Sequence, residues 1–387
     1  MKITSVETIV TRGLSRPWLF CVIRTDEGVT GYSEFGNGYI PHGLVGLVRD
    51  LSTLIIGKDP RPVEKHYMDM YRFTRAQWGG AMQMAIAGVE LALWDIKGKA
   101  LGVPVYELMG GPHRDHQRVY WSHLASYHAS SWKNAGVEPL RTWDDVAACV
   151  QLAKDAGYTA FKTNIVFPGD PPRSISQGTM GPHDQNLSTD LLNHAVQQLS
   201  IMREAAGPDM DICLDINVNF KTEGAIRLGR ALEPYRLFWM EIDNQDAKSL
   251  AQLKASTKTP ICTGEQHLTM RQYQPFFEHR AMDTVKVDVQ WQGFAAAKKV
   301  ADLAETYEMN IAPHNYNGHL STFQSLNLTA SVSNVRIMES DPLQAEWRDE
   351  LFTNLPEIEN SHMKIPQGPG WGTDLDEDAA MKYAYEG

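Results

Sequence analysis

Short β-rich runs alternate with longer amphipathic stretches from about residue 118 to residue 340, and this alternation limits the possible folds more than any other feature. Strands are expected at eight places: Val119–Ala125, Ala160–Val166, Asp211–Val218, Leu237–Ile242, Pro260–Glu265, Thr284–Val289, Asn310–His314 and Val335–Glu339. Helix-like segments lie in the gaps, at 143–156, 189–205, 221–233 and 293–308. Strands and helices in this order form right-handed βαβ units on a parallel sheet. Eight units of this length favour a closed barrel over an open sheet.

The chain on either side of this region has a different pattern. Strands are expected at Ile3–Val10, Trp18–Arg24 and Thr30–Glu34, followed by a long helix over 81–101. We therefore predict an α+β capping domain over 1–115, completed by a C-terminal tail over 351–387, and a barrel over 116–350. Within the barrel, the stretch 167–188 is rich in Gly, Pro and polar residues. It is predicted to be a long irregular loop over the active face, where it would shape a pocket or an oligomer contact.

The composition excludes several classes of function. The 387 residues include 36 Lys and Arg against 47 Asp and Glu, a net charge of −11, so no nucleic-acid or anionic-membrane partner is expected. No apolar run is long enough to span a membrane, and the start of the chain lacks the pattern of a signal peptide. The four cysteines lie far apart, which favours reduced thiols and a cytoplasmic location.

A polar residue stands near the end of most of the predicted barrel strands. These residues are Lys162, Asp215, Glu241, Glu265, Asp288, His314 and Glu339. From Asp215 onward their spacings are 26, 24, 23, 26 and 25 residues, about one strand–helix unit each. Equivalent positions on successive parallel strands form a ring at the C-terminal mouth of a barrel, where barrel enzymes keep their active sites. One carboxylate at a strand end is usually a helix cap, but several buried around one axis need a cation to offset their charge.

Three consecutive members of this ring, Asp215, Glu241 and Glu265, offer only oxygen ligands. A ligand set without Cys or His suits a hard divalent ion, with Mg²⁺ first and Mn²⁺ as the alternative. Such an ion would act as a Lewis acid on a substrate oxygen. We therefore expect a Mg²⁺ site at the mouth of the barrel.

The next two members of the ring are Asp288 and His314. An Asp beside a His orients the imidazole and raises its basicity, so the pair is expected to act as a general base. A base facing a metal-bound carboxylate would remove the proton from the adjacent carbon, and the resulting enediolate would need electrostatic stabilisation. Glu339, if protonated, would hydrogen-bond the developing enediolate oxygen. Lys162 would pair with the substrate carboxylate.

Eight sequence motifs follow one another along the chain, each occurring once. They are ALWDIKGKALGVPVYELMGG (92–111), FKTNI (161–165), LDIN (214–217), MEID (240–243), TGEQ (263–266), VKVD (285–288), APHN (312–315) and MES (338–340). In order and spacing they resemble the enolase superfamily, and within it the mandelate racemase-like subgroup, over essentially the whole chain. The resemblance implies a modified (β/α)7β TIM barrel with an α+β capping domain. It also implies Mg²⁺ on the three consecutive acids, a His314–Asp288 base and removal of the proton α to a carboxylate, with assistance from Glu339.

Substrate selection in such enzymes falls to loops of the capping domain. Here the corresponding stretches are 13–20 and 35–43, whose candidate contacts are Arg16, Trp18, Tyr39 and His42. The barrel adds further candidate substrate-binding residues, namely Asn164, Asn217, His123 and Tyr316.

The second barrel strand departs from the pattern of the family's racemases. Those enzymes carry Lys-x-Lys there, whereas this chain has Lys162-Thr163-Asn164. Because an amide cannot take up a proton at neutral pH, Asn164 favours a one-base reaction such as β-elimination of water from a sugar acid. Lys-x-Asn also resembles the aldonate dehydratases of the subgroup. The motif MEID replaces the commoner Glu-Glu-Pro but keeps the ligand Glu241.

Several groups are candidates for the acid that expels the leaving hydroxide. Some aldonate dehydratases carry a His two residues after the first metal ligand for this purpose, and here that place is Asn217. His314 could return the proton itself in a syn elimination. The other candidates are Tyr316, His183 and His123, of which His123 stands out because it lies in the first predicted barrel strand.

The leading interpretation is a Mg²⁺-dependent aldonate or aldarate dehydratase, a hydro-lyase that forms a 2-keto-3-deoxy sugar acid. A cycloisomerase or an epimerase or racemase with the same metal site is the alternative, and a non-catalytic sugar-acid-binding barrel is a third interpretation. The expected partner is a small anionic sugar acid. A symmetric homo-oligomer, a dimer or an octamer, is also expected.

Overall fold

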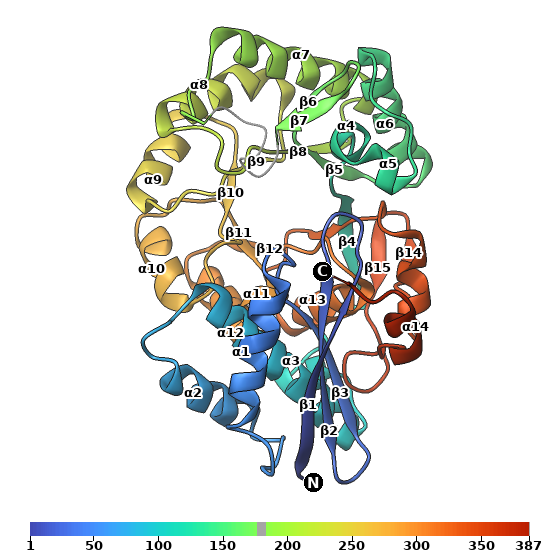
Figure 1. The fold of residues 1–387 in the computed structure, drawn as a ribbon. Helices are drawn as coiled ribbons and strands as arrows, with labels where there is room; N and C mark the ends of the chain where they lie inside the picture. Colours follow the sequence, from blue (N-terminus) through green and yellow to red (C-terminus); the bar gives the residue numbers. More distant parts are fainter. Residues whose placement is uncertain (176–182, 387) are drawn as a thin grey trace.

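Three antiparallel strands open the chain in the computed structural model, which describes residues 1–175 and 183–386 (Figure 1). These strands pair in the order β1-β2-β3. The N-terminal elements are β1 (Ile3–Thr11), β2 (Trp18–Thr25), β3 (Thr30–Phe35), α1 (Pro41–Ser52), α2 (Val63–Phe73), α3 (Gly80–Leu101) and the 3-10 helix η1 (Val105–Met109). The three predicted strands and the long predicted helix are confirmed. Gly28, at φ +80°, makes the tight turn between β2 and β3.

Helix α3 connects the N-terminal elements to the barrel. Its side chains from Met84 to Ile96 are all buried. They are buried because the helix packs against both β3 and α11 (Val289–Gln292), which belongs to the barrel. A helix enclosed in this way has no solvent-facing polar side, so most of these residues are apolar or small, and the two acids among them, Glu90 and Asp95, are hydrogen-bonded. Gly102 ends the helix in the left-handed conformation of a C-cap.

Eight parallel strands close into a barrel. They are β4 (His116–Trp121), β5 (Ala160–Thr163), β8 (Asp211–Asp215), β9 (Trp239–Glu241), β10 (Ile261–Thr263), β11 (Thr284–Val287), β12 (Asn310–Pro313) and β13 (Met338–Ser340). They pair in the order β4-β5-β8-β9-β10-β11-β12. β13 pairs with β4 and, through the bridge Ile311↔Val335, its segment meets β12, which completes the ring. All eight predicted strands are thus confirmed.

Seven helices follow the first seven barrel strands and cover the barrel from outside (Figure 1). They are α6 (Trp143–Asp155), α7 (Thr189–Ala206), α8 (Thr222–Leu232), α9 (Ala247–Ser256), α10 (Met270–Glu278), α12 (Phe294–Thr306) and α13 (His319–Ser331). Shorter helices are α4 (Ser126–Ser130), α5 (Trp132–Ala135) and the 3-10 helix η2 (Glu233–Tyr235). The predicted (β/α)7β barrel is the observed fold.

The stretch 167–188 is more regular at its start than its composition predicts. A short antiparallel hairpin joins β6 (Ile165–Phe167) and β7 (Arg173–Ile175). Ile165, Val166 and Ile175 are buried. Each strand of the hairpin has three residues, too few to show an apolar–polar alternation in the sequence, and burial of these apolar side chains stabilises the pair. Residues 176–182 lie outside the described residues.

The C-terminal tail contacts both the N-terminal sheet and the barrel, whereas the sequence predicted contact with the capping domain alone. It contains η3 (Glu346–Leu351), β14 (Ile358–Glu359), β15 (His362–Lys364) and α14 (Glu377–Lys382). β15 pairs antiparallel with β4. Glu377 of α14 forms an ion pair of 2.6 Å with Arg24 of β2, and the Tyr385 amide donates to the Val10 carbonyl. The exact division into 1–115 and 116–350 remains a prediction.

In the part of the chain that the structure describes, none of the helices combines the length and apolar character that crossing a bilayer requires. The four cysteines, Cys21, Cys149, Cys213 and Cys262, are all buried free thiols.

Candidate active site

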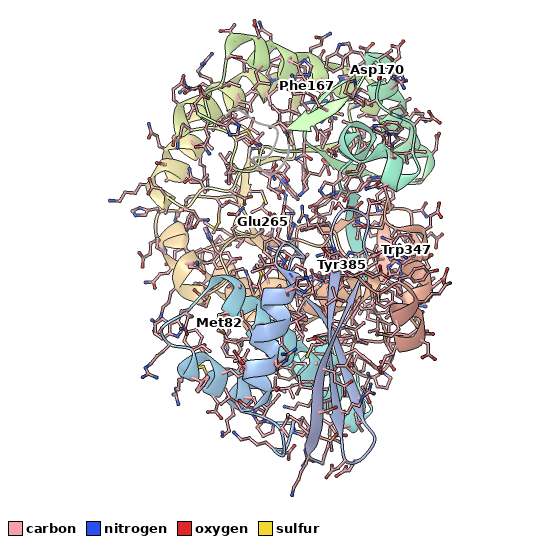
Figure 2. All side chains as sticks on the ribbon, in the orientation of Figure 1. Met82, Phe167, Asp170, Glu265, Trp347 and Tyr385 are labelled. Atoms are coloured by element: carbon pink, nitrogen blue, oxygen red, sulfur yellow. The ribbon has the colours of Figure 1, made fainter. Side chains whose placement is uncertain are left out.

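The three acids predicted to bind a metal stand at the ends of neighbouring strands. Asp215 is the last residue of β8 and lies in register with Glu241, the last residue of β9. Glu265 comes two residues after the end of β10, the next strand of the sheet. They are 6%, 1% and 7% exposed, respectively. Figure 2 shows Glu265 near the middle of the molecule.

Burial and mutual repulsion control the ionisation of these acids. Burial raises the pKa of Glu265 well above its ordinary range, and the neighbouring Asp243 and Glu241 raise it further. Burial also raises the pKa of Asp215, although Lys162 acts in the opposite direction. Glu265 Oε2 is buried and has no hydrogen-bond partner among the described residues. A cation would relieve this repulsion, so the all-oxygen donor set fits a hard divalent ion.

Asp243 is an acid of this site that the sequence analysis missed. It is half-buried, and its Oδ2 accepts a hydrogen bond of 3.0 Å from Gln266 Nε2. Burial together with the charges of Asp215 and Glu241 raises its pKa to about 8. The signal was its place in MEID, where the common motif has Pro. Asp243 therefore adds a negative charge to a region that is already acidic.

Lys162 lies within the acidic ring. Its Nζ is 2.9 Å from Glu339 Oε1, 3.0 Å from Glu241 Oε1 and 3.4 Å from Asp215 Oδ2. In the structure this ammonium is paired with three carboxylates of the chain, and its predicted pairing with a substrate carboxylate stays a prediction. Across residues 1–175 and 183–386, no group of three or more His, Cys, Asp or Glu side chains is arranged in a way that could hold a metal ion. Lys162 therefore links the acids in the arrangement observed.

A second buried lysine, Lys286, lies in the interior of the barrel and was also missed. Its side chain is fully buried, with Nζ 3.3 Å from Glu339 Oε2 and 3.5 Å from Glu241 Oε2. It donates a hydrogen bond of 2.6 Å to Tyr120 OH. Lys286 precedes Asp288 by two residues, so the period of two along a strand would have placed it on the same side of β11.

Glu339 is ionised in this setting. Burial acts to raise its pKa, but Lys162 and Lys286 together hold the pKa well below the ordinary range. Its oxygens accept hydrogen bonds from Ser122 Oγ at 2.5 Å and from the Asn315 amide at 3.0 Å. The predicted donor role required a protonated Glu339. In the structure Glu339 accepts these two hydrogen bonds and lies beside two ammonium groups, and its role toward an enediolate stays a prediction.

His314 and Asp288 form the pair that their spacing predicted. His314 Nδ1 lies 2.6 Å from Asp288 Oδ2, and Asp288 Oδ1 accepts a hydrogen bond from the Trp291 amide at 2.9 Å. The opposite ring nitrogen, Nε2, is 3.4 Å from Glu265 Oε2. Burial raises the pKa of Asp288, which the nearby imidazole lowers in turn. The imidazole is thus fixed by one nitrogen while the other faces the acids.

A cavity of about 270 Å³ lies beside these groups. The predicted residues that line it are Lys162, Asp215, Glu265, His314, Asn164, Asn217, His123, Tyr39 and Tyr316. Its other lining residues are Arg16 and five hydroxyl-bearing residues, Ser15, Ser126, Tyr127, Ser130 and Ser131. The cavity therefore combines two acids of the ring, the imidazole of the His314–Asp288 pair and a wall of hydroxyl groups.

Arg16 connects the capping loops to the barrel at this cavity. Its Nη1 donates a hydrogen bond of 2.6 Å to Tyr316 OH, and its guanidinium carbon lies 4.0 Å from the centre of the Tyr39 ring. The stretches 13–20 and 35–43 therefore reach the cavity, as the sequence predicted.

Three candidate residues lie elsewhere. Trp18 starts β2 and is 5% exposed, because its indole packs within the N-terminal core against Gly13 instead of facing the cavity. His42, on α1, has its ring 6.3 Å from that of Tyr385 in the tail. His183 is exposed.

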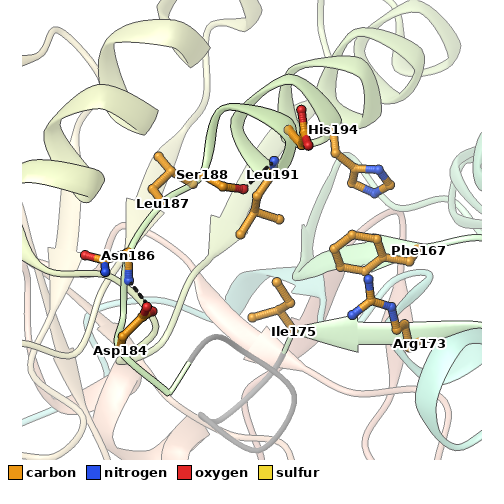
Figure 3. Close-up of a pocket in the computed structure, with 10 residues that line it drawn as sticks. Phe167, Arg173, Ile175, Asp184, Asn186, Leu187, Ser188, Leu191 and His194 are labelled. Carbon is orange, nitrogen blue, oxygen red and sulfur yellow. Dashed lines mark hydrogen bonds between the residues drawn. The ribbon is translucent and has the colours of Figure 1, made fainter.

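A larger hollow, of about 650 Å³, lies between the hairpin β6–β7 and the start of α7 (Figure 3). Phe167 stacks there on His194 and lies under the Arg173 guanidinium. Its described lining includes none of the predicted catalytic or metal-binding residues. Size alone therefore does not identify the active site, and the cavity at the barrel mouth is the candidate.

The chain forms a closed (β/α)7β barrel with a separate antiparallel N-terminal sheet. Acids stand at the ends of consecutive barrel strands. These features define a class of barrel proteins with a capping domain and an acidic site at the mouth of the barrel. The family comparisons agree with this class. Residues 4–110 match the model for the N-terminal domain of mandelate racemase / muconate lactonizing enzyme, and residues 144–379 match the enolase C-terminal domain-like model. The chain belongs to the mandelate racemase / muconate lactonizing enzyme family of the enolase superfamily.

Several characterised relatives align over almost their whole length. The chain is 30% identical to a D-xylonate dehydratase of Haloferax volcanii, covering 100% of this chain and 90% of the relative. It is 31% identical to a D-galactonate dehydratase of Ralstonia nicotianae, over 97% and 93%. It is also 30% identical to a D-mannonate dehydratase of Rhizorhabdus wittichii, over 100% and 96%.

Solved structures of the same fold carry other names. One, described as an L-alanine-DL-glutamate epimerase from Burkholderia xenovorans and bound to magnesium and fumarate, has a TM-score of 0.95 and 36% identity over 99% of this chain and 96% of that one. Another is the 3,6-anhydro-D-galactonate cycloisomerase of Zobellia galactanivorans, with a TM-score of 0.84 and 25% identity over the full length of both chains.

Proposed function

We propose that this protein is a Mg²⁺-dependent sugar-acid dehydratase, which removes water from an aldonate or aldarate to give a 2-keto-3-deoxy sugar acid. The observation that carries the proposal is one cavity with a hydroxyl-rich wall, lined by His314, whose Nδ1 Asp288 holds, and by the strand-end acids Asp215 and Glu265. A wall of this kind suits a polyhydroxy substrate, whose hydroxyl groups both donate and accept hydrogen bonds. The names of the three relatives support the same reaction class.

Asp215, Glu241 and Glu265 are the residues that would hold Mg²⁺. Their oxygen donors and the buried Glu265 Oε2, which accepts no hydrogen bond among the described residues, support this assignment, while Mn²⁺ is the other ion with the same ligand preference. When bound, the ion would supply Lewis-acid stabilisation of negative charge on the substrate carboxylate.

His314 is the residue that would take the proton from C2 of the substrate. Its Nδ1 is bound to Asp288, which keeps the imidazole in one orientation and leaves Nε2 as the basic nitrogen. Nε2 lies beside Glu265, so the base and the substrate carboxylate held near that acid would be neighbours. Negative charge that develops on the substrate would lie near Lys162 as well.

The environment of Asn164 favours elimination over two-base racemisation or epimerisation. Its Oδ1 accepts from Ser126 Oγ at 2.9 Å, and its Nδ2 donates to the Asp215 carbonyl at 3.1 Å. An amide held in this way has no basic atom to offer to the second face of C2. This is the position where racemases of the family carry their second lysine.

The direct test is to incubate the purified protein and Mg²⁺ with D-xylonate, D-galactonate, D-mannonate and related aldarates. Formation of a 2-keto-3-deoxy acid, detected as its semicarbazone, is expected with at least one acid. His314→Asn should lower the rate by about 10² to 10⁴ because a general base is lost. His279→Gln, an exposed histidine, is the matched control and should retain full activity. A product of unchanged mass would point to the cycloisomerase or epimerase alternative and contradict the proposal, and no turnover would favour a binding protein.

A further inference from the structure

A second His–Asp pair lies at the mouth of the barrel, next to the first. His123 Nδ1 is 2.9 Å from Asp341 Oδ2, and the His123 ring lines the catalytic cavity. The arrangement repeats that of His314 and Asp288, where Nδ1 also faces the carboxylate. In both pairs Nε2 is the nitrogen that Asp does not engage.

Asp341 is firmly held. It is 6% exposed, and its Oδ2 also accepts hydrogen bonds from Tyr127 OH at 2.7 Å and from Gln344 Nε2 at 3.0 Å. Its carbonyl accepts a hydrogen bond of 2.7 Å from Arg348 Nη1. Burial and the Asp341 charge raise the pKa of Tyr127 well above its ordinary range, so this hydroxyl acts as a donor to Asp341.

His123 has an unusual backbone conformation for a residue other than glycine. Its φ is +55°, in the left-handed region, which residues other than glycine seldom adopt and where functional residues are common. The Leu124 amide donates to the Lys162 carbonyl at 2.9 Å, which ties the segment to the next barrel strand. The imidazole stacks on the Tyr127 ring with centroids 4.8 Å apart. These contacts aim the imidazole at a fixed place.

The two imidazoles flank one tyrosine. The Tyr316 ring centroid lies 4.9 Å from that of His314 and 5.7 Å from that of His123. His314 follows β12 and His123 follows β4, and in the closed barrel only β13 stands between these strands. A base and an acid that serve adjacent carbons of one substrate need this kind of proximity.

We propose that His123 is the catalytic acid that protonates the leaving hydroxyl group, with Asp341 as its positioning residue. The assignment rests on the proposed dehydratase function. It adds the proton donor for the leaving hydroxyl, a role that then falls to neither Asn217 nor His314. After His314 has removed the C2 proton, the enediolate electrons form the C2=C3 bond and the C3–O bond breaks. The protonated His123 gives the Nε2 proton to the departing oxygen, which leaves as water. The enol then becomes the 2-keto acid by losing its hydroxyl proton and gaining one at C3. His314 releases the proton from C2 to solvent and His123 regains one from solvent, so both imidazoles return to their starting states.

Other groups of the cavity are less suited to this step. Burial raises the pKa of Tyr316 far above neutrality, and its hydroxyl oxygen accepts the hydrogen bond from Arg16. Asn217 carries an amide, which does not release a proton. Among the described residues that line the cavity, His123 and His314 are the two histidines.

The test separates proton removal from water loss. In D₂O, the wild-type protein should dehydrate the best acid of the panel. His123→Asn keeps an amide toward Asp341 but has no proton to transfer, so dehydration should fall by about 10² to 10⁴. Deuterium should still enter C2, because His314 can remove and return a proton there. His279→Gln should match the wild-type protein in both measurements.

A change of leaving group provides the second measurement. The 3-deoxy-3-fluoro analogue of the same acid loses fluoride, which departs without full protonation, so His123→Asn should eliminate fluoride at within about tenfold of the wild-type rate. Such rescue shows that the variant is folded and retains its base. Asp341→Asn should lower kcat for water loss with a small change in KM and should show the same rescue, as a positioning residue would.

The outcomes distinguish the two proposals. Wild-type protein that neither exchanges C2 hydrogen nor dehydrates any acid overturns the proposed function, and this assignment with it. Wild-type dehydration that His123→Asn retains within about threefold overturns only the role of His123 and leaves His314 as both base and acid. Equal loss of water elimination, C2 exchange and fluoride elimination in His123→Asn would also overturn it, because His123 would then serve the structure of the whole site.

Discussion

Lys286 offers the sharpest test of the charge balance inside the barrel. Replacing it by Met keeps a side chain of similar length and removes the ammonium that lies 3.3 Å from Glu339 and 3.5 Å from Glu241. At an effective dielectric constant of about 20, each of these attractions is worth about 5 kcal/mol before the desolvation of the ions is subtracted. Breaking a buried ion pair by removing one partner destabilises a protein by about 3–5 kcal/mol. We expect about 3 kcal/mol, because Lys162 still lies 2.9 Å from Glu339.

The assay is urea unfolding followed by far-UV circular dichroism, with the free energy of unfolding taken from the midpoint and slope. Lys65→Met is the matched control. Lys65 pairs with Asp69 at 2.6 Å on the exposed face of α2, and an exposed pair of this kind is worth about 0.3–0.5 kcal/mol. The double variant Lys286→Met, Glu339→Gln should recover part of the loss, since it removes a carboxylate that the single variant leaves undercompensated. A Lys286→Met variant within about 1 kcal/mol of wild type, or equal to Lys65→Met, would refute the ionic account of the barrel interior.

Three further predictions concern the metal, pH and the capping loops. Asp215→Asn should reduce Mg²⁺ affinity by at least about tenfold in calorimetric titration, because a charged ligand is lost, and unchanged binding would contradict the metal assignment. Burial, with a smaller contribution from Arg348, lowers the pKa of His319 to about 4. The unfolded chain takes up that proton near pH 6.5 and the folded protein only near pH 4, so wild type should lose about 3 kcal/mol relative to His319→Gln between pH 7 and pH 4, and parallel stability profiles would refute this. Arg16→Ala should raise KM about tenfold with a smaller effect on kcat, since it removes the contact with Tyr316, and an unchanged KM would exclude Arg16 from substrate binding.

The barrel and its acidic ring were predictable because both depend on one period. Asp215, Glu241 and Glu265 repeat at the length of a strand–helix unit, and strands of a closed barrel place such residues side by side. The same period placed His314 beside Asp288, at 2.6 Å. A sequence spacing of one strand–helix unit predicts neighbouring positions in the barrel because each unit has the same structure as the one before it.

What the sequence did not predict depends on contacts across the closed barrel. His123 and Asp341 are 218 residues apart and meet because β4 pairs with β13, the last barrel strand. Lys286 was missed for another reason. A lysine inside a strand is normally solvent-exposed, and its burial here depends on Glu241 of β9 and Glu339 of β13, which reach it across the barrel interior. Trp18 was misplaced because an aromatic residue in a capping loop can face either a cavity or the core, and residue type alone does not distinguish them.

The charges at the barrel mouth explain how an acidic protein can bind an acidic substrate. Lys162 and Lys286 lower the pKa values of Glu241 and Glu339 against the effect of burial, so these two acids are compensated by the chain itself. Three more acids, Asp215, Asp243 and Glu265, keep raised pKa values, which shows that the two lysines do not balance the whole cluster. A divalent cation would supply the missing charge and add +2 to the formal −11 of the chain. The proposed metal therefore has two roles that the structure connects: it would allow the remaining acids to ionise, and it would turn a repulsive cavity into one that attracts a carboxylate.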